Sequence, residues 1–585
     1  MNSLLGRVAR SALLCLPLIC FGDPSKVAPD LASADPHSKV DVIVQFVSPP
    51  SGEDAHSIDQ LGGVPGEGDL GLIRAKLYSI PAKAVAALAH NPNVAYISPD
   101  RALSPTLDSA NSTIGAQTAF SYGWTGAGIG VAIIDSGILM ENDLLNQGSH
   151  GARIVYSQSF VPKVPRTIDK YGHGTHVAGI VAGNGAASTG VPYFKTFRGV
   201  APAANLINLR VLDDNGGGTD SAVIAAISAA IQLKSKYNIR VINLSVGRPV
   251  YESYTLDPLC QAVEKAWNAG IVVVVAAGNQ GRNQSLGTDG YATITAPGND
   301  PMVITVGAMK TMGTPSRVDD LIASYSSKGP TLLDHVAKPD IVAPGNRIIS
   351  LEASKGATLS DSGVNEILYS YYQKSSNNSY SADYYQLSGT SMAAPMVSGA
   401  AALMLEKDSS LTPDTIKARL MKTATKTFPL SSTAVDPVTG IMYTSQYDIF
   451  TIGAGYLDVW GALNNTDSVP PDSTAASPIA VFDSSTNTVT IVNADTAVWG
   501  THAVWGTHAV WGTTDIWDTH AVWGTSVFVD GQAALWGTSG VWGNTAVWGT
   551  GGTQGNTAVW GTHAVWGTTT SDAIEGMSLM VNGEN

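Results

Sequence analysis

The chain has 585 residues, too many for one ordinary domain, so we expect several units. Hydrophobic residues make up 44% of it, enough for a large core, while charged residues make up only 14%. The formal net charge of -14 argues against a nucleic-acid-binding protein, because such proteins carry basic contact surfaces.

The first 22 residues have the features of a signal peptide. Arg7 and Arg10 precede a short apolar run at residues 11–21, and small residues allow cleavage after Gly22. A membrane anchor is the alternative, but a run this short does not span a bilayer comfortably. We therefore expect residues 1–22 to be removed and the protein to be secreted to the extracellular space.

Cleavage there would also remove two of the three cysteines, Cys15 and Cys20. The remaining Cys260 would have no partner for an internal disulfide, so stability must come from the core or from bound ions. Cys260 lies in a helix-like stretch. We expect it to be a buried small hydrophobic residue rather than a nucleophile.

Residues 38–103 read as a small α/β unit. An apolar-rich strand is predicted at residues 40–47 and an alternating strand at residues 73–80. Proline is tolerated in the first turn of a helix, so a helix is predicted at residues 81–89. A last short strand is predicted at residues 94–97.

Residues 104–466 alternate short apolar runs with helical stretches. Continuous apolar strands separated by helices predict an α/β unit with a doubly wound parallel sheet. The expected strands are residues 130–135, 205–212, 241–245, 271–277, 302–307 and 340–343, and the expected helices include residues 173–183, 221–236 and 257–268.

A linker is predicted at residues 467–495, followed by repeats of the hexapeptide Thr-His-Ala-Val-Trp-Gly at residues 496–570 and a tail at residues 571–585. The repeat tract contains no Lys, Arg or Glu. Stacked short strands in a β-solenoid are favoured, because so much tryptophan is costly to leave in water. A disordered tract rich in glycine and threonine is the alternative. Either form could serve adhesion, self-association or carbohydrate stacking.

Three segments place a reactive side chain at the end of a predicted element. They are Val131-Ala-Ile-Ile-Asp135 at the end of a strand, Gly172-His173-Gly-Thr-His176 at the start of a helix, and Gly389-Thr-Ser391-Met-Ala-Ala-Pro at the start of another. In a parallel sheet, carboxyl ends of strands and amino ends of helices gather on one edge. A serine nucleophile there needs a base, and the base needs an orienting acid. Taken singly, each segment is explained equally well by a turn, a loop or a cap.

Together, the three segments closely resemble the signature motifs of the subtilisin family, and their chain order matches as well. The resemblance implies that Ser391 is the nucleophile and that His173 is first the general base and then the general acid. Asp135 would orient the histidine, and His176 resembles a second, structural histidine of the family. No cofactor would be required for this chemistry.

The resemblance extends to the remaining site residues. Asn279 follows a predicted strand and resembles the asparagine that binds the oxyanion, although a plain turn residue is the alternative. The substrate-binding residues that the resemblance implies are Ala276, Ala277 and Gly278 in one pocket wall, Ser245, Val246 and Gly247 in the opposite wall, and Gly216, Gly217 and Gly218 in an edge that pairs with extended substrate. Thr295 is a candidate for narrowing the pocket.

The similarity covers residues 38–465 and departs from the family in two places. Residues 38–103 resemble the family's inhibitory propeptide, which has a ferredoxin-like α/β fold. The loop at residues 184–198 is lengthened and lacks the acids that help many relatives to hold calcium. Structural calcium is therefore possible only with other ligands, and Asp143 is either such a ligand or a surface turn residue. The insertion at residues 351–383 has no assigned role.

The sequence thus predicts a secreted serine endopeptidase that cleaves polypeptides through an acyl-enzyme intermediate. It would be made as a zymogen that processes itself and is inhibited by its own propeptide. The rival hypothesis is an adhesive or binding protein that uses the tryptophan-rich repeats for cell-surface or carbohydrate contact on a protease-fold scaffold. A complete set of Asp135, His173, Ser391 and Asn279 favours the enzyme. An acyl-transfer ligase is a third option.

Overall fold

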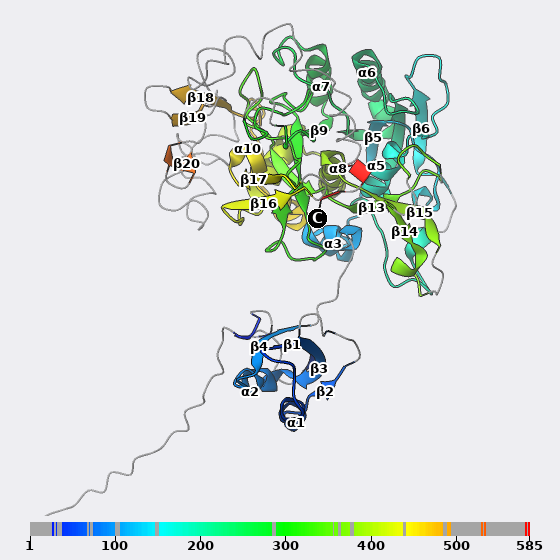
Figure 1. Ribbon diagram of the computed structural model, residues 1–585. Coiled ribbons are helices and arrows are strands. Elements are labelled where there is room, and N and C mark those ends of the chain that lie inside the picture. Colours follow the sequence, from blue (N-terminus) through cyan, green and yellow to red (C-terminus); the bar gives the residue numbers. More distant parts are fainter. Residues whose placement is uncertain are drawn as a thin grey trace, which may run out of the picture. The chain divides into compact units, whose positions relative to one another are not determined.

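The computed structural model describes residues 26–28, 31, 38–66, 70, 74–99, 106–146, 151–283, 288–354, 356–360, 364–374, 379–436, 440–483, 488–492, 528–529, 532–533, 580–581 and 583–584. The chain divides into two compact units, Met1–Leu103 and Ser104–Asn585 (Figure 1). The predicted signal peptide and, apart from four residues, the repeat tract lie outside the described residues, so the choice between solenoid and disorder stays open.

The first unit is a four-stranded antiparallel sheet in the order β2-β3-β1-β4. Its elements follow one another as β-α-β-β-α-β, the order of ferredoxin-like folds. They are β1 (Lys39–Phe46), α1 (Gly52–Gln60), β2 (Val64–Pro65), β3 (Ala75–Pro81), α2 (Val85–Leu88) and β4 (Val94–Pro99), with a short 3-10 turn, η4 (Ala82–Ala84), before α2.

Alternation along β1 explains how this unit forms a core. Val42, Val44 and Phe46 point inward and are buried, while the residues between them are more exposed. Helix α1 was missing from the sequence prediction. It begins at a capping box in which the side chains of Ser51 and Asp54 each accept a hydrogen bond from the other's backbone N–H, a local signal that the sequence does contain.

The second unit is built on an eight-stranded sheet in the order β11-β10-β9-β8-β5-β7-β6, with β12 beside β10. Its pairs are parallel except for β10 with β11, as the predicted α/β class requires. The strands are β5 (Gly130–Asp135), β6 (Ile154–Ser159), β7 (Asn205–Arg210), β8 (Ile239–Leu244), β9 (Val272–Ala276), β10 (Ile304–Lys310), β11 (Leu321–Ile322) and β12 (Ile341–Pro344).

Two pairs of helices pack on this sheet (Figure 1). Helix α6 (Asp220–Tyr237) packs with α7 (Pro258–Asn268), and α5 (His173–Ala182) packs with α8 (Thr390–Lys407). Helix α8 contacts β8, β9, β10 and β12 and is buried from Thr390 to Leu405. Such a helix must be apolar on all sides, which its run of Ala, Met, Val and Leu provides.

The strand order reverses at the crevice between β5 and β8. From β5 the chain continues toward β6 on one side, and from β8 it continues toward β9 on the other. In open α/β sheets, ligands bind outside the carboxyl ends of the strands at such a reversal. The fold therefore points to the ends of β5 and β8 as the place for a site.

The insertion at residues 351–383 and the lengthened loop at residues 184–198 pack against each other. The insertion belongs to a second, antiparallel sheet, β13-β15-β14, formed by β13 (Ile348–Leu351), β14 (Glu366–Leu368) and β15 (Tyr380–Leu387). Tyr372 of the insertion stacks against the ring of Tyr193 and contacts that of Phe197, both in the loop. The two departures from the family pattern thus form one structural feature.

The interpretation of residues 467–495 as a linker needs correction. Ser477 is buried, donates to the carboxylate of Asp340 and accepts a hydrogen bond at 2.9 Å from Lys417, so this segment completes a buried ionic cluster. A hairpin of β18 (Ile479–Asp483) and β19 (Thr488–Val492) follows it. The content of Pro, Ser, Thr and Asp in residues 467–495 is typical of linkers. Here, however, the hydroxyl of Ser477 binds buried charged groups.

Cys260 is buried in α7, and burial raises the pKa of its thiol, in keeping with a packing role. Within the part of the chain that the structure describes, no helix is both long and apolar enough to cross a membrane.

Candidate active site

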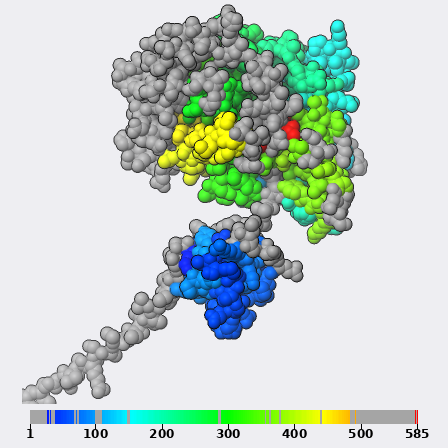
Figure 2. Space-filling model, in the orientation of Figure 1, coloured from blue at the N-terminus to red at the C-terminus, as the bar shows by residue number. Residues whose placement is uncertain are grey.

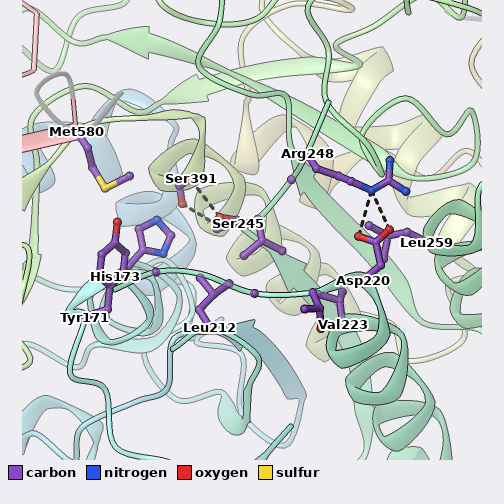
Figure 3. Close-up of a pocket in the computed structure, with 15 residues that line it drawn as sticks. Tyr171, His173, Leu212, Asp220, Val223, Ser245, Arg248, Leu259, Ser391 and Met580 are labelled. Carbon is purple, nitrogen blue, oxygen red and sulfur yellow. Dashed lines mark hydrogen bonds and ion pairs between the residues drawn. The ribbon is translucent and has the colours of Figure 1, made fainter. Parts of the chain in front are cut away.

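Three predicted residues meet where the strand order reverses. Asp135 is the last residue of β5, His173 the first of α5 and Ser391 the second of α8. All three are buried, and Ser391 is the most accessible, with 7% of its surface exposed. His173 and Ser391 line the same pocket, which has a volume of about 410 Å³ (Figure 3).

Asp135 holds the imidazole of His173 from behind. Its two carboxylate oxygens lie 2.8 Å and 2.9 Å from Nδ1 of His173. Burial by itself lowers the pKa of His173, but the charge of Asp135 and its hydrogen bond outweigh burial, so the pKa is raised. Because the carboxylate accepts the proton on Nδ1, Nε2 is the ring nitrogen left to act as a base.

The hydroxyl of Ser391 donates a hydrogen bond to the carbonyl of Ser245 at 3.3 Å (Figure 3). The hydroxyl of Ser245 in turn donates to the carbonyl of Ser391 at 2.8 Å. These bonds tie the end of β8 to the start of α8. A rotation of the Ser391 side chain is needed before its Oγ can give a proton to His173, and such adjustments are usual when a substrate is absent.

Asn279 binds the start of α8 through its amide oxygen. Its Oδ1 accepts hydrogen bonds from the backbone N–H of Thr390 at 2.9 Å and from the Thr390 hydroxyl at 3.0 Å. A backbone N–H can only donate, so the oxygen must face Thr390 and Nδ2 must lie on the other side. A side chain at Gly389 would place its Cβ 3.1 Å from Nδ2, so glycine keeps this donor accessible. The arrangement can hold negative charge next to Ser391.

The structure brings together part of the predicted substrate-binding set. Gly216, Gly218, Ser245, Val246 and Gly247 line the pocket with His173 and Ser391. Among the described residues, Gly217, Ala276, Ala277 and Gly278 are not part of that lining.

Thr295 separates the two predicted walls. A Cβ added at Gly247 would lie 2.7 Å from Thr295 Oγ1, and one at Gly278 would lie 2.8 Å from Thr295 Cγ2. Both walls therefore need glycine for Thr295 to fit between them. Its side chain fills the space on that side of the pocket.

The sequence prediction missed Asp169, which joins the parts of the site around the histidine. Its buried carboxylate accepts hydrogen bonds from Gly172 N, from the Ser136 hydroxyl, and from both the N–H and the hydroxyl of Thr175, all between 2.7 Å and 2.9 Å. It thereby links the end of β5 to the first turn of α5. Burial raises the pKa of Asp169. An acid three residues before Gly172 was the available sequence signal.

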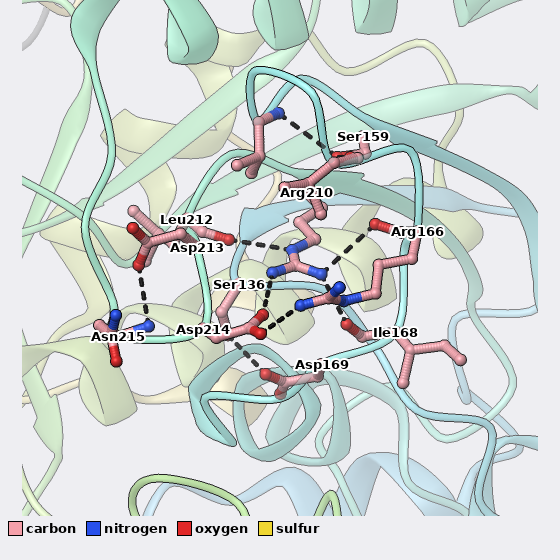
Figure 4. A network of polar contacts seen from close by, with 12 residues as sticks. Ser136, Ser159, Arg166, Ile168, Asp169, Arg210, Leu212, Asp213, Asp214 and Asn215 are labelled. Carbon is pink, nitrogen blue, oxygen red and sulfur yellow. Dashed lines mark hydrogen bonds and ion pairs between the residues drawn. The ribbon is translucent and has the colours of Figure 1, made fainter.

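A second missed feature supports the glycine-rich edge (Figure 4). Asp214, two residues before Gly216, forms ion pairs with Arg166 and with the buried Arg210, the latter at 2.7 Å. Hydrogen bonds from Arg166 and Arg210 hold the pKa of Asp214 below its usual range. Arg210 also donates to the Leu212 carbonyl at 3.0 Å, so the network anchors the segment that leads into the glycine-rich edge.

The insertion and the end of β15, just beyond it, support the loop that carries the histidine. The hydroxyl of Tyr385 donates to the carbonyl of Gly172 at 2.6 Å, and Leu359 N donates to the carbonyl of Tyr171 at 3.0 Å. His176 lies one turn into α5, with Nε2 2.9 Å from the carbonyl of Ile348. Burial lowers the pKa of His176 to about 3, so it stays neutral and donates that hydrogen bond.

Asp143, the candidate calcium ligand, is engaged by protein groups. Its carboxylate accepts from Ala187 N and from the Tyr384 hydroxyl, each at 2.7 Å. Arg153 donates to the carbonyl of Asp143 at 2.5 Å and to that of Ala182 at 2.6 Å. Within the described residues, no group of three or more His, Cys, Asp and Glu side chains is arranged to hold a metal ion. Structural calcium remains a prediction.

Comparison with known proteins adds independent information. A model of the subtilase family matches residues 126–441. Serine protease AprX of Bacillus subtilis (strain 168) is 38% identical over 340 residues, which are 57% of this chain and 70% of that protein. Subtilisin E of the same strain is 34% identical over 358 residues, which are 60% of this chain and 76% of that protein. Subtilisin DY of Bacillus licheniformis is 36% identical over 312 residues, 53% and 89% of the two chains.

Among solved structures, a cold adapted subtilisin-like serine proteinase is 28% identical, with a TM-score of 0.37. The match covers 52% of this chain and 85% of that one.

Proposed function

Because this chain belongs to the subtilase family and is a subtilisin-like serine protease, we propose that it is an endopeptidase with Asp135, His173 and Ser391 as its catalytic triad. The observation that carries the proposal is the buried pair of Asp135 and His173, 2.8 Å apart, in the same pocket as the serine at the start of α8. A buried histidine with a raised pKa in the same pocket as a serine hydroxyl is an arrangement that can activate a nucleophile.

The proposed reaction begins when Ser391 turns from the Ser245 carbonyl toward His173. Nε2 of His173 takes the hydroxyl proton while Oγ attacks the carbonyl carbon of the substrate. Asp135 stabilises the imidazolium that forms. The imidazolium then gives its proton to the leaving amine, so the peptide bond breaks and an ester with Ser391 remains. Water, deprotonated by His173, hydrolyses that ester and restores the serine.

The negative oxygen of the tetrahedral intermediate would be bound by two donors. Asn279 Nδ2 is free to point toward it, since Oδ1 is occupied by Thr390. The backbone N–H of Ser391, in the first turn of α8, is the second donor, and helix amino ends favour negative charge.

Substrate residues before the cut would lie extended between the Gly216–Gly218 edge and the segment from Ser245 to Gly247. Glycine at the edge leaves room for a peptide to pair as an added strand. Beyond this pair the pocket is lined by Leu212, Val223 and Leu259 and by the ion pair of Arg248 with Asp220. Because the two charges neutralise each other, the three apolar side chains favour apolar substrate side chains. Polypeptides in extended conformation are therefore the proposed substrates.

The remaining segments complete the proposal. The first unit has a core of its own, as expected of a propeptide that folds, inhibits the enzyme and is then cut away by it. Residues 1–22 would direct secretion, and the tryptophan-rich repeats would contact cell surfaces or carbohydrate. No cofactor takes part in the chemistry, and calcium would be structural.

The test uses a fluorophosphonate probe, which labels only an activated serine, together with casein as substrate. The wild type should be labelled at Ser391 and should degrade casein. Ser391→Ala should lose both activities and remain an uncut precursor in a protease-free host. The activity should fall by about 10⁶-fold, as in a related subtilisin.

A wild type that folds but is not labelled would support the adhesive scaffold instead. Labelling that leads to peptide joining, with casein left intact, would support the acyl-transfer ligase.

A further inference from the structure

A short segment distant in sequence lies at the pocket with His173 and Ser391. Met580 is one of the pocket's lining residues (Figure 3). Part of this segment, coloured red in Figure 2, is visible at the surface of the second unit. The described residues of the segment are Met580, Val581, Gly583 and Glu584. We refer to these four residues as the docked segment.

The docked segment is anchored by a buried glutamate. Oε1 of Glu584 lies 2.7 Å from Lys310 Nζ, and Oε2 lies 3.2 Å from Arg282 Nη2. Oε2 also accepts hydrogen bonds from the N–H of Ser324 at 2.9 Å and from its hydroxyl at 2.7 Å. Glu584, Arg282 and Lys310 are each no more than 6% exposed. Four donors around one carboxylate, away from water, make a site built for a carboxylate.

The balance of charge in this site makes the anchor specific. Arg282 has one other carboxylate partner, Asp436, at 2.9 Å. Without Glu584, the buried Arg282 and Lys310 would both lose the carboxylate that they share. Leaving a buried charge without its partner is strongly unfavourable, so the site needs an anion. Glu584 of the same chain supplies it.

The backbone of the segment is also held. Asn346 donates to the carbonyl of Glu584 at 2.7 Å and accepts from the N–H of Glu584 at 2.9 Å. Ser388 N donates to the carbonyl of Met580 at 2.8 Å. Gly583 adopts a φ of 68°, and a Cβ there would lie 2.6 Å from the Ser388 hydroxyl, so only glycine fits. The segment therefore docks through both its backbone and its one acidic side chain.

The docked segment lies on the side of the site opposite the apolar subsite. In Figure 3, Met580 is beside Tyr171 and His173, whereas Val223 and Leu259 lie at the far end of the pocket. Under the proposed function, residues before the cut occupy the end lined by Val223 and Leu259. Met580 thus lies where residues after the cut would have to lie.

We propose that residues 580–584 are a built-in competitive inhibitor of the protease, anchored by Glu584 in a carboxylate-binding site formed by Arg282, Lys310 and Ser324. This inference rests on the proposed function. A substrate with residues after the cut must break the hydrogen bond between Ser388 and Met580 and displace the docked segment. A substrate that ends at the cut competes with the docked segment much less. Release of Glu584 is the step that opens this half of the groove.

The test compares two substrates with variants of the full-length chain. One substrate is an internally quenched peptide with four residues after the cut, and the other is a p-nitroanilide with none. If the segment fills the groove in about nine of ten molecules, its release raises kcat/KM on the long peptide by about tenfold, mainly through KM. Glu584→Ala should show this rise and a smaller one on the anilide. Asp472→Asn, which removes an exposed carboxylate, is the matched control and should change neither value.

Glu584→Ala leaves Arg282 and Lys310 underneutralised and is at risk of misfolding. Met580→Gly avoids this problem because it keeps the anchor and removes only the side chain at the pocket. It should also raise kcat/KM on the long peptide. A synthetic peptide of residues 578–585 should inhibit the Glu584→Ala enzyme, whose carboxylate-binding site is vacant, and the same peptide with alanine for glutamate should not.

The outcomes separate this inference from the proposed function. If Met580→Gly has the wild-type kcat/KM on the long peptide while Ser391 still reacts with fluorophosphonate, the docked segment is no inhibitor and the protease assignment stands. An equal rise on both substrates would also overturn the inference, because it would mean that the segment does not compete with residues after the cut. If no variant reacts with the probe, the proposed function itself fails.

Discussion

Asp135 and His173 lie among buried hydrogen-bonding groups, whereas Ser391 begins a helix packed with alanine, glycine and methionine. On the histidine side, the carboxylate of Asp169 alone accepts four hydrogen bonds, and Tyr385 adds another to the same loop. On the serine side, α8 is buried from Thr390 to Leu405 against five strands. The position of His173 is thus fixed mainly by hydrogen bonds, and the position of the helix that carries Ser391 mainly by close packing.

This difference implies different weaknesses. Buried hydrogen bonds have strict geometry, so a change of one atom in an acceptor leaves donors unpaired. A buried helix also tolerates substitution by polar residues poorly, but the volume of its side chains is the stricter constraint because the core around it is close-packed. The histidine side should therefore respond to isosteric changes of polarity and the serine side to added methyl groups.

The largest effect concerns Asn279, which is bound to the start of α8 on the serine side. Asn279→Ala removes the Nδ2 donor while Thr390 loses only its acceptor. We expect kcat to fall by about 10²–10³-fold with little change in KM, since the donor acts on charge that develops only in the transition state. The size of this loss is taken from a subtilisin. Steady-state kinetics on a p-nitroanilide measures it.

Asn464→Ala is the control for Asn279→Ala, because Asn464 is exposed and far along the chain in α11 (Val459–Asn464). A loss of less than about tenfold for Asn279→Ala would mean that this residue only closes a turn.

The second effect is the pH dependence that the histidine side should impose. Protonated His173 cannot act as a base, so kcat/KM should fall by about tenfold for each pH unit below the pKa of His173. Asp135 raises that pKa above 6.5, although burial opposes it, so the midpoint of the fall should lie above pH 6.5. Measuring kcat/KM between pH 5 and pH 9 checks this.

His176 should not contribute to this profile, because burial holds its pKa at about 3. A midpoint clearly below 6.5 would show that Asp135 does not stabilise the charged imidazole as the geometry implies.

The third effect tests Asp169 directly. Asp169→Asn keeps the shape but replaces one accepting oxygen by an NH2 group, so two of the four donors lose their acceptor. We expect the protein to lose about 1–3 kcal/mol of stability and the first turn of α5 to shift. Because α5 begins at His173, kcat should fall by about tenfold, since small misplacements are costly in catalysis.

Thermal unfolding and kinetics on the same sample separate the two losses for Asp169→Asn. Full activity in a destabilised protein would show that Asp169 supports the fold but does not position the histidine.

The same comparison explains what the sequence could predict. Asp135, His173, Ser391 and Asn279 each lie at the end of a strand or the start of a helix, and local patterns mark such places. The hydrogen bonds of Asp169 to Ser136, and the docking of Glu584 on Lys310, join segments far apart in the chain. No local periodicity marks such contacts, because their partners become neighbours only after folding.

The correction of the linker interpretation, and the role found for the insertion, have the same origin. Residues 467–495 have the composition of a linker, yet Ser477 closes a buried cluster around Asp340. The insertion at residues 351–383 was assigned no role, yet its Leu359 donates a hydrogen bond to the carbonyl of Tyr171, two residues before His173. By contrast, helix α1 was missed although its local signal, Ser51 with Asp54, was present in the sequence.

The smallest expected effect on activity tests the serine side. Gly399 lies in the middle of α8, and a Cβ there would lie 2.5 Å from Cβ of Val200 and 2.9 Å from its Cγ1. Because neither atom is the end of a flexible side chain, the backbone must move, and Gly399→Ala should cost about 1–3 kcal/mol of stability. Two turns of helix separate Gly399 from Ser391, so kcat should change by less than about threefold and the midpoint of the pH profile should not move. Thermal unfolding together with the pH profile gives both quantities. A variant that keeps its stability but loses activity would show that the serine side, like the histidine side, depends on exact placement more than on packing.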